Sequence, residues 1–199
     1  MKKDKKNIKN TSTCIIGLVH KNDIYIGGDS AGTDGSYNQT IRADEKVFIN
    51  KSEDMIFGFC SSYRMGQILR YCFEAPEQQE HQDDYEYLCS DFMDELIKCM
   101  KEKHFIITTE EIISEVYLSG SFLLGYKKKL YKIEEDCQVA KNKLPYDAVG
   151  CGAEYALGAM HAISNNKLTP IQKITACLKS AEKFNAAVKG PFKILKLKG

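Results

Sequence analysis

The sequence has no hydrophobic run long enough to cross a membrane and no excess of charge of either sign. Its longest apolar runs reach about eight residues, whereas a membrane-spanning helix needs about 20. Lys and Arg together number 28, and Asp and Glu together number 27. This balance gives no electrostatic argument for a nucleic-acid or membrane partner. We therefore predict a soluble protein that binds neither.

The sequence also lacks the cysteine and histidine spacings that are typical of metal sites. None of the eight cysteines forms a CxxC pair, and several lie among apolar residues, where a thiol behaves as a small hydrophobic group. The apolar run at residues 14–19 is too short for a secretion signal. Gly150-Cys151-Gly152 lacks the third glycine of a dinucleotide-binding loop. The sequence thus predicts a reduced, cytoplasmic protein without a metal or other cofactor.

The chain does have the composition of a globular protein. Of its 199 residues, 43% are hydrophobic and 28% are charged, which excludes wholesale disorder. Residues 1–12 form a charged tail with nothing to bury, and we predict that this tail is disordered or a propeptide. Residues 13–199 have the length of a single domain.

Hydrophobic periodicity within this domain predicts an α+β fold. Ser61 or Ser62 would cap the first helix, and Thr169-Pro170 would begin the last one, whose buried stripe would include Ile171 and Val188. Turn-forming residues predict a loop at 30–35. Strands are predicted at 13–19, 24–29, 46–50, 55–60, 117–126, 130–134, 137–140 and 192–197, and helices at 65–73, 86–103, 154–164 and from 170. This order suits stacked sheets with helix pairs on their outer faces.

The first predicted hairpin brings a hydroxyl group close to a carboxylate. If residues 13–19 fold back on residues 24–29, Cys14 faces Asp29 and Thr13 faces Ser30. Opposite residues of neighbouring strands lie about 5 Å apart. Two interpretations follow: Asp29 acts together with Thr13, or it only begins the next loop by bonding its own backbone.

Five segments resemble, in the same order, proteasome β-type subunits and the bacterial HslUV peptidase subunit, which are N-terminal-nucleophile (Ntn) hydrolases. TCIIGLVHKNDIYIGGDS, with TDGSY and RADEKV after it, is similar to their opening: Asp29 follows Thr13 by sixteen residues, and Lys46 precedes a hydrophobic residue. MIFGFCSSYRMGQILRY is similar to the strand that carries an oxyanion glycine, here Gly58. DAVGCGAEYALGAMHAI has Cys151 where the family usually has a supporting serine.

This resemblance implies a four-layer αββα sandwich with two stacked, mainly antiparallel sheets, and a threonine-type peptidase. Thr13 would be the nucleophile, and its own α-amine would be the base after the tail is removed. Lys46 would keep that amine neutral and stabilise negative charge, Asp29 would orient Lys46, and the Gly58 N–H would bind the oxyanion. Without the resemblance, Lys46 is interpreted as a surface lysine and Gly58 as a point of close backbone packing. Cys14 is a second candidate nucleophile.

Three departures from the family pattern keep an inactive alternative open. Twelve residues precede Thr13, and the residue directly before it is Ser12 instead of the usual glycine. Cys151 is a poorer hydrogen-bonding residue than the serine it replaces. Asn185 stands where the family has Asp, and Val188 where it has Ser. The chain is therefore interpreted as an active threonine peptidase or, alternatively, as an inactive structural or assembly subunit; an amidase that acts on a small molecule would use the same residues.

The resemblance also implies partners that no motif of this sequence specifies. An active member would take a polypeptide substrate, assemble into a homo-oligomeric ring and receive its substrate from an ATPase unfoldase. No ring interface and no ATPase-docking motif is recognisable in the sequence itself. These partners are expectations from the family alone.

Overall fold

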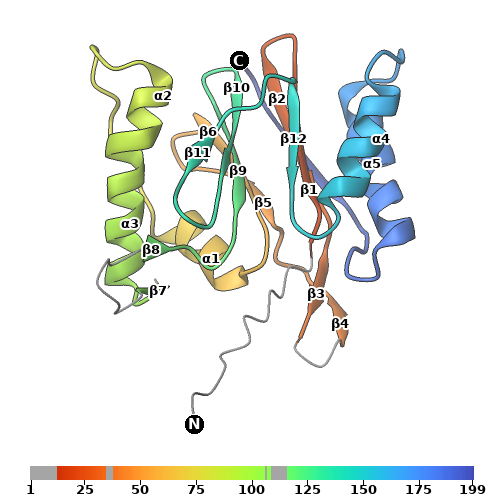
Figure 1. The fold of residues 1–199 in the computed structure, drawn as a ribbon, viewed down its shortest axis with the longest axis horizontal. Helices are drawn as coiled ribbons and strands as arrows, with labels where there is room; N and C mark the ends of the chain where they lie inside the picture. Colours follow the sequence, from red (N-terminus) through yellow and green to blue (C-terminus); the bar gives the residue numbers. More distant parts are fainter. Residues whose placement is uncertain (1–12, 35–37, 106, 109–115) are drawn as a thin grey trace.

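The computed structural model describes residues 13–34, 38–105, 107–108 and 116–199, so the tail predicted at residues 1–12 lies outside the described part. Two β-sheets stack face to face, and helices cover the outer face of each sheet (Figure 1). The order of layers is therefore helix, sheet, sheet, helix. This confirms the predicted αββα sandwich.

The first sheet has the order β12-β1-β2-β13, and all of its neighbouring strands are antiparallel. Lys21 and Asn22 form the hairpin turn with positive φ angles of 51° and 72°, which match the right-handed twist of the strands. The register pairs Ile15 with Gly28, and beyond this pair the Asp29 N–H donates to the Cys14 carbonyl. The predicted pairing of Cys14 with Asp29 is therefore confirmed. The strands are β1 (Ile15–His20), β2 (Asp23–Gly28), β12 (Tyr146–Val149) and β13 (Lys193–Leu197).

The second sheet has the order β11-β10-β9-β6-β5, and two short ribbons pair β3 with β4 and β7 with β8. The loop predicted at 30–35 was wrong for Ala31–Thr33, because these residues continue from β2 and pair with Gln39–Ile41. Gly35 lies outside the described residues. The strands are β3 (Ala31–Thr33), β4 (Gln39–Ile41), β5 (Val47–Ile49), β6 (Met55–Phe59), β7 (Ile107–Thr108), β8 (Val116–Tyr117), β9 (Phe122–Tyr126), β10 (Lys129–Ile133) and β11 (Val139–Ala140).

Two of the helices, α1 and α5, begin at caps that the sequence predicts. The Ser62 side chain accepts a hydrogen bond from the Met65 N–H at the start of α1, and Thr169 with Gln172 forms a capping box at the start of α5. Ile171 is 54% exposed, because the buried face of α5 begins only at Ile174, and Val188 is buried beyond the end of that helix. The helices are α1 (Tyr63–Tyr71), α2 (Asp84–Tyr87), a π-helical turn (Leu88–Phe92), α3 (Met93–Glu102), α4 (Ala153–Ile163) and α5 (Pro170–Phe184).

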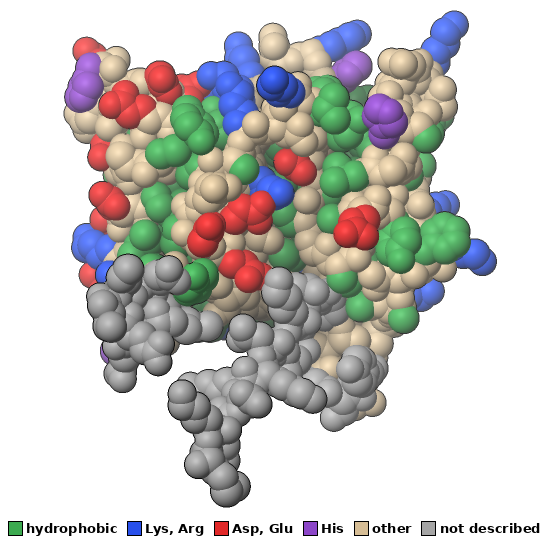
Figure 2. All heavy atoms as spheres, viewed as in Figure 1, with side chains coloured by type: hydrophobic (Ala, Val, Ile, Leu, Met, Phe, Trp, Pro, Cys, Tyr) green, Lys and Arg blue, Asp and Glu red, His purple; other side chains and the backbone are tan. Residues whose placement is uncertain are grey.

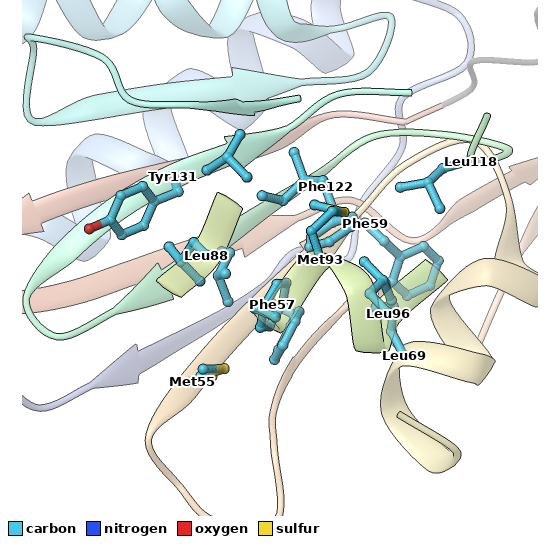
Figure 3. Close-up of a cluster of buried hydrophobic side chains, with 14 of the residues drawn as sticks. Met55, Phe57, Phe59, Leu69, Leu88, Met93, Leu96, Leu118, Phe122 and Tyr131 are labelled. Atoms are coloured by element: carbon cyan, nitrogen blue, oxygen red, sulfur yellow. The ribbon is translucent and has the colours of Figure 1, made fainter. Parts of the chain in front are cut away.

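Three layers of buried side chains hold the sandwich together. One fills the space between the second sheet and α1 to α3, with aromatic and aliphatic side chains such as Phe57, Phe122 and Leu96 (Figure 3). A second lies between the first sheet and α4 and α5, and a third lies between the two sheets. Successive residues of β1 serve different layers: Ile15 belongs to the layer between the sheets and Ile16 to the helix side. This alternation with period two fixes which side of β1 faces the second sheet.

Charged side chains of both signs lie on the protein surface (Figure 2). Acidic side chains are scattered across the middle of the face in Figure 2, and most basic side chains lie toward its edges. All eight cysteines are free. Within the described ranges, no helix has both the length and the apolar character that a membrane span requires.

Candidate active site

Thr13, Asp29 and Lys46 meet at one end of the sandwich. Thr13 lies two residues before β1, Asp29 directly follows β2, and Lys46 directly precedes β5 of the other sheet. The Lys46 Nζ donates to Thr13 Oγ1 and to Asp29 Oδ1, both at 2.9 Å. Each of the three residues is only 2% exposed. The stacking of the two sheets thus brings a hydroxyl, a carboxylate and an ammonium into direct contact.

The Asp29 carboxylate is held by backbone amides in addition to Lys46. Its Oδ1 accepts from the Cys14 N–H at 3.0 Å, and its Oδ2 accepts from the Ala31 N–H at 2.9 Å and the Lys189 N–H at 3.4 Å. Charge-assisted bonds of this kind stabilise a buried carboxylate. Asp29 therefore ties together the residue before β1, the start of β3 and the segment that precedes β13, and it presents its carboxylate to Lys46.

The Lys46 ammonium has an acceptor for each of its three protons. The third acceptor is the Ala31 carbonyl, at 2.6 Å, and the Tyr63 ring centroid lies 5.7 Å from Nζ. Burial lowers the pKa of Lys46 below its ordinary value, and the Asp29 carboxylate opposes that shift. A lysine that donates to a threonine hydroxyl in this way stabilises negative charge that develops on the hydroxyl oxygen.

Cys151 contacts the backbone of Thr13, and Asn185 in turn contacts Cys151. The Thr13 N–H donates to Cys151 Sγ at 3.4 Å, and this sulfur lies 3.5 Å from both the Thr13 carbonyl oxygen and Asn185 Oδ1. The Asn185 amide donates to the Cys151 carbonyl at 2.8 Å. Burial raises the pKa of the Cys151 thiol, so the sulfur is held as a neutral SH group. The predicted supporting residues thus lie beside the predicted nucleophile.

Gly150 makes room for the Thr13 backbone. Its φ is +94°, and a Cβ atom added there would lie 2.4 Å from the Thr13 carbonyl oxygen. We expect Gly150→Ala to lower the free energy of unfolding by about 1–3 kcal/mol, because alanine is strained at this φ and must push Thr13 away. Chemical denaturation measures this change.

Gly158→Ala in α4 is the matched control, because a Cβ there has no neighbour within 4 Å. Alanine is favoured over glycine inside a helix by about 0.5–1 kcal/mol, so this variant should be slightly stabilised. If the two variants changed stability in the same direction, close contact with Thr13 would not explain why position 150 requires glycine.

Gly58 lies inside β6, in register with Val47 on one side and Leu123 on the other. The Phe59 N–H donates to the Lys46 carbonyl on the β5 side, and the Cys60 N–H donates to the Ser121 carbonyl on the β9 side. Because successive N–H groups of a strand point to opposite sides, the Gly58 N–H points toward β9. An added Cβ would meet the side chains of Ile15 and Ile26. This position matches close packing between the sheets, and the oxyanion role of Gly58 stays a prediction.

Cys14, the second candidate nucleophile, points into the core. Its side chain is fully buried in the layer beneath α4 and α5. Burial and the nearby Asp29 carboxylate raise the pKa of its thiol, which disfavours the reactive thiolate. The geometry therefore favours Thr13 over Cys14.

Two further groups at the site were not identified from the sequence. The Ala31 carbonyl accepts from Lys46, and the Tyr63 hydroxyl donates to the same carbonyl at 3.4 Å. A backbone carbonyl has no sequence signature, and Tyr63 is an ordinary aromatic residue at a helix start. Across the ranges that the structure describes, no group of three or more His, Cys, Asp or Glu side chains is arranged to hold a metal ion.

Comparisons with known proteins agree on the fold. No family model and no curated protein sequence matches the chain. Among solved structures, BPH from Thiobacillus denitrificans is similar with a TM-score of 0.73 and 18% identity, over 94% of this chain and 98% of the other. Eukaryotic HslV from Trypanosoma brucei follows with a TM-score of 0.66 and 14% identity, over 94% and 100%. Anbu, the ancestral β-subunit from Yersinia bercovieri, has a TM-score of 0.62 and 12% identity, over 94% and 82%.

These likenesses span nearly the whole chain, and they agree with the layered arrangement of sheets and helices. At such low identity they bear on the fold alone. The chain therefore has the proteasome-like Ntn-hydrolase fold, the fold of HslV.

Proposed function

We propose that this protein is a threonine-type hydrolase that cleaves peptide or amide bonds with Thr13 after residues 1–12 have been removed. One observation carries the proposal: a buried lysine ammonium donates at 2.9 Å to both the Thr13 hydroxyl and the Asp29 carboxylate. A buried charge is costly unless it is paired and hydrogen-bonded. Here one of its three acceptors is the proposed nucleophile, so the ammonium lies where it can stabilise negative charge on the Thr13 oxygen.

The proposed reaction uses groups that lie within reach of one another. In the trimmed chain, the Thr13 α-amine takes the proton from Oγ1, which attacks the substrate carbonyl carbon. Lys46 stabilises the charge on the threonine oxygen and favours the neutral amine, whose ordinary pKa is about 8. The amine then gives the proton to the leaving nitrogen as the C–N bond breaks, and water hydrolyses the resulting ester in the same way.

A structural subunit without turnover is the second candidate, and two observations favour it. Thr13 N–H donates to a sulfur atom at 3.4 Å, and Asn185 provides an amide where the family has a carboxylate. Sulfur is a weak hydrogen-bond partner, and an amide carries no charge. A free α-amine would therefore be less firmly oriented here than beside a serine and an aspartate.

The partners follow from the same proposal. A polypeptide is the proposed substrate, and a homo-oligomeric ring fed by an ATPase unfoldase is the proposed assembly. Native mass spectrometry of the purified chain measures the ring directly. A monomer at micromolar concentration would contradict this assembly without affecting the proposed chemistry of a single subunit.

Intact-mass analysis and N-terminal sequencing of purified protein test the activity. We expect a chain that begins at Thr13 and that gains the mass of one epoxomicin molecule on incubation; a BPH structure from Thiobacillus denitrificans holds this compound. A chain that keeps residues 1–12 and gains no mass would favour the structural subunit. If an added protease removed residues 1–12 and the chain still gained no mass from epoxomicin, Thr13 would be ruled out as the nucleophile more directly.

A further inference from the structure

We propose that the pocket between the β5–β6 hairpin and the end of α1 binds a small carboxylate attached to an apolar group. The cavity has a volume of about 290 Å³. Ligand pockets usually span about 300–1,000 Å³, so this one suits a small molecule or the last residue of a peptide. It lies apart from Thr13, Asp29 and Lys46, none of which lines it. The proposal does not depend on the function proposed above.

One side of this pocket is apolar. Phe57 of β6, Leu69 of α1, and Phe73 and Ala75 of the following segment provide this surface. Leu69 and Phe57 are buried, whereas Phe73 and Ala75 are partly exposed. An aromatic or branched aliphatic group would cover these side chains and remove apolar area from water.

The other side carries the positive charge of Arg70, and no carboxylate of the described residues forms an ion pair with it. Arg70 lines the pocket, and no ion pair within residues 13–34, 38–105, 107–108 and 116–199 includes it. Its Nη2 donates to the carbonyls of Glu45 at 2.7 Å and Val47 at 3.1 Å, and its buried Nε has no partner in the described part of the chain. Phe48 covers one face of the guanidinium at 4.7 Å. The guanidinium therefore has N–H donors that no acceptor of the described residues uses.

Lys51 adds a second positive charge at the mouth of the pocket. Its side chain is 76% exposed and lies 3.7 Å from Glu74, a distance at which exposed ions attract each other only weakly. A ligand carboxylate can replace such a partner at little cost. Charge complementarity therefore selects an anion, and Arg70 favours a planar carboxylate that can accept two hydrogen bonds.

Arg70 also connects the pocket with the backbone on either side of Lys46. The two carbonyls that Arg70 holds belong to Glu45 and Val47, the residues on either side of Lys46. A ligand that contacts the guanidinium therefore touches the side chain that fixes the backbone of Lys46.

Isothermal titration calorimetry of the full chain with 4-phenylbutyrate tests this proposal. We expect saturable binding of one equivalent per chain, and binding at least about tenfold weaker for the neutral 4-phenylbutanamide, because a hydrogen-bonded charge is lost. Equal affinity for the acid and the amide would overturn the proposal. It would also be overturned if neither 4-phenylbutyrate nor N-acetyl-Leu-Phe bound. Titration of N-acetyl-Leu-Phe with a free and with an amidated C-terminus shows whether the carboxylate comes from a peptide end or from a free acid.

Variants on the same helix separate the pocket from general charge effects. Arg70→Met should weaken binding of 4-phenylbutyrate at least about tenfold, whereas Arg64→Met, an exposed arginine of α1 outside the pocket, should leave it unchanged. Ala75→Leu fills the cavity and should abolish binding even if Arg70→Met does not fold. Binding that survives Ala75→Leu would place the ligand elsewhere.

Discussion

Replacing Thr13 with Ala should leave the chain at full length and lower peptide hydrolysis by at least about ten-thousand-fold. The hydroxyl is the proposed attacking group, and losses of this size are typical when a nucleophile is removed. Intact mass reports the processing, and turnover of a fluorogenic peptide by variant chains trimmed with an added protease reports the chemistry. Thr13→Ser keeps a hydroxyl at the same position and should retain measurable activity.

Cys14→Ala is the control for the alternative nucleophile. Because the Cys14 thiol is fully buried and faces α4 and α5, this variant should be processed and labelled like the wild type. The change of a buried thiol to a methyl group costs some stability but leaves the Thr13 hydroxyl in place. If turnover survived Thr13→Ala and disappeared in Cys14→Ala, Cys14 and not Thr13 would be the nucleophile.

Replacing Lys46 with Met should lower turnover by at least about a hundredfold and the free energy of unfolding by about 3–5 kcal/mol. The first effect is the loss of charge stabilisation at the Thr13 oxygen. The second arises because removal of one partner leaves the buried Asp29 carboxylate without its ammonium partner. Urea denaturation measures the stability, and peptide turnover at a temperature where the variant stays folded measures the activity.

Two comparisons separate these effects. Lys51→Met removes a lysine whose side chain is 76% exposed, and its stability should stay within about 0.5 kcal/mol of the wild type. Lys46→Met combined with Asp29→Asn removes both charges of the buried pair and should recover part of the lost stability without recovering turnover. An active double variant would remove the ion pair from the mechanism.

Local patterns in the sequence predicted much of the fold. The β1–β2 hairpin shows why: two β-branched runs flank a short polar turn, so the register that sets Cys14 against Asp29 follows from chain neighbours alone. The caps of α1 and α5 are equally local. By contrast, β12 was missed because Tyr146–Val149 is short and includes a charged residue, and it becomes a strand only by pairing with β1. Ala31–Thr33 likewise needs Gln39–Ile41 as its partner.

The sequence by itself determined most of the strands and helices, the hairpin that places Thr13 near Asp29, and the resemblance that singled out Lys46. Only the tertiary structure decided that Lys46 reaches both groups, because it precedes a strand of the opposite sheet and arrives through sheet stacking. The tertiary structure likewise turned Cys14 into the core and set Gly58 between the sheets. Contacts between distant segments depend on how layers pack, and no local periodicity encodes that packing.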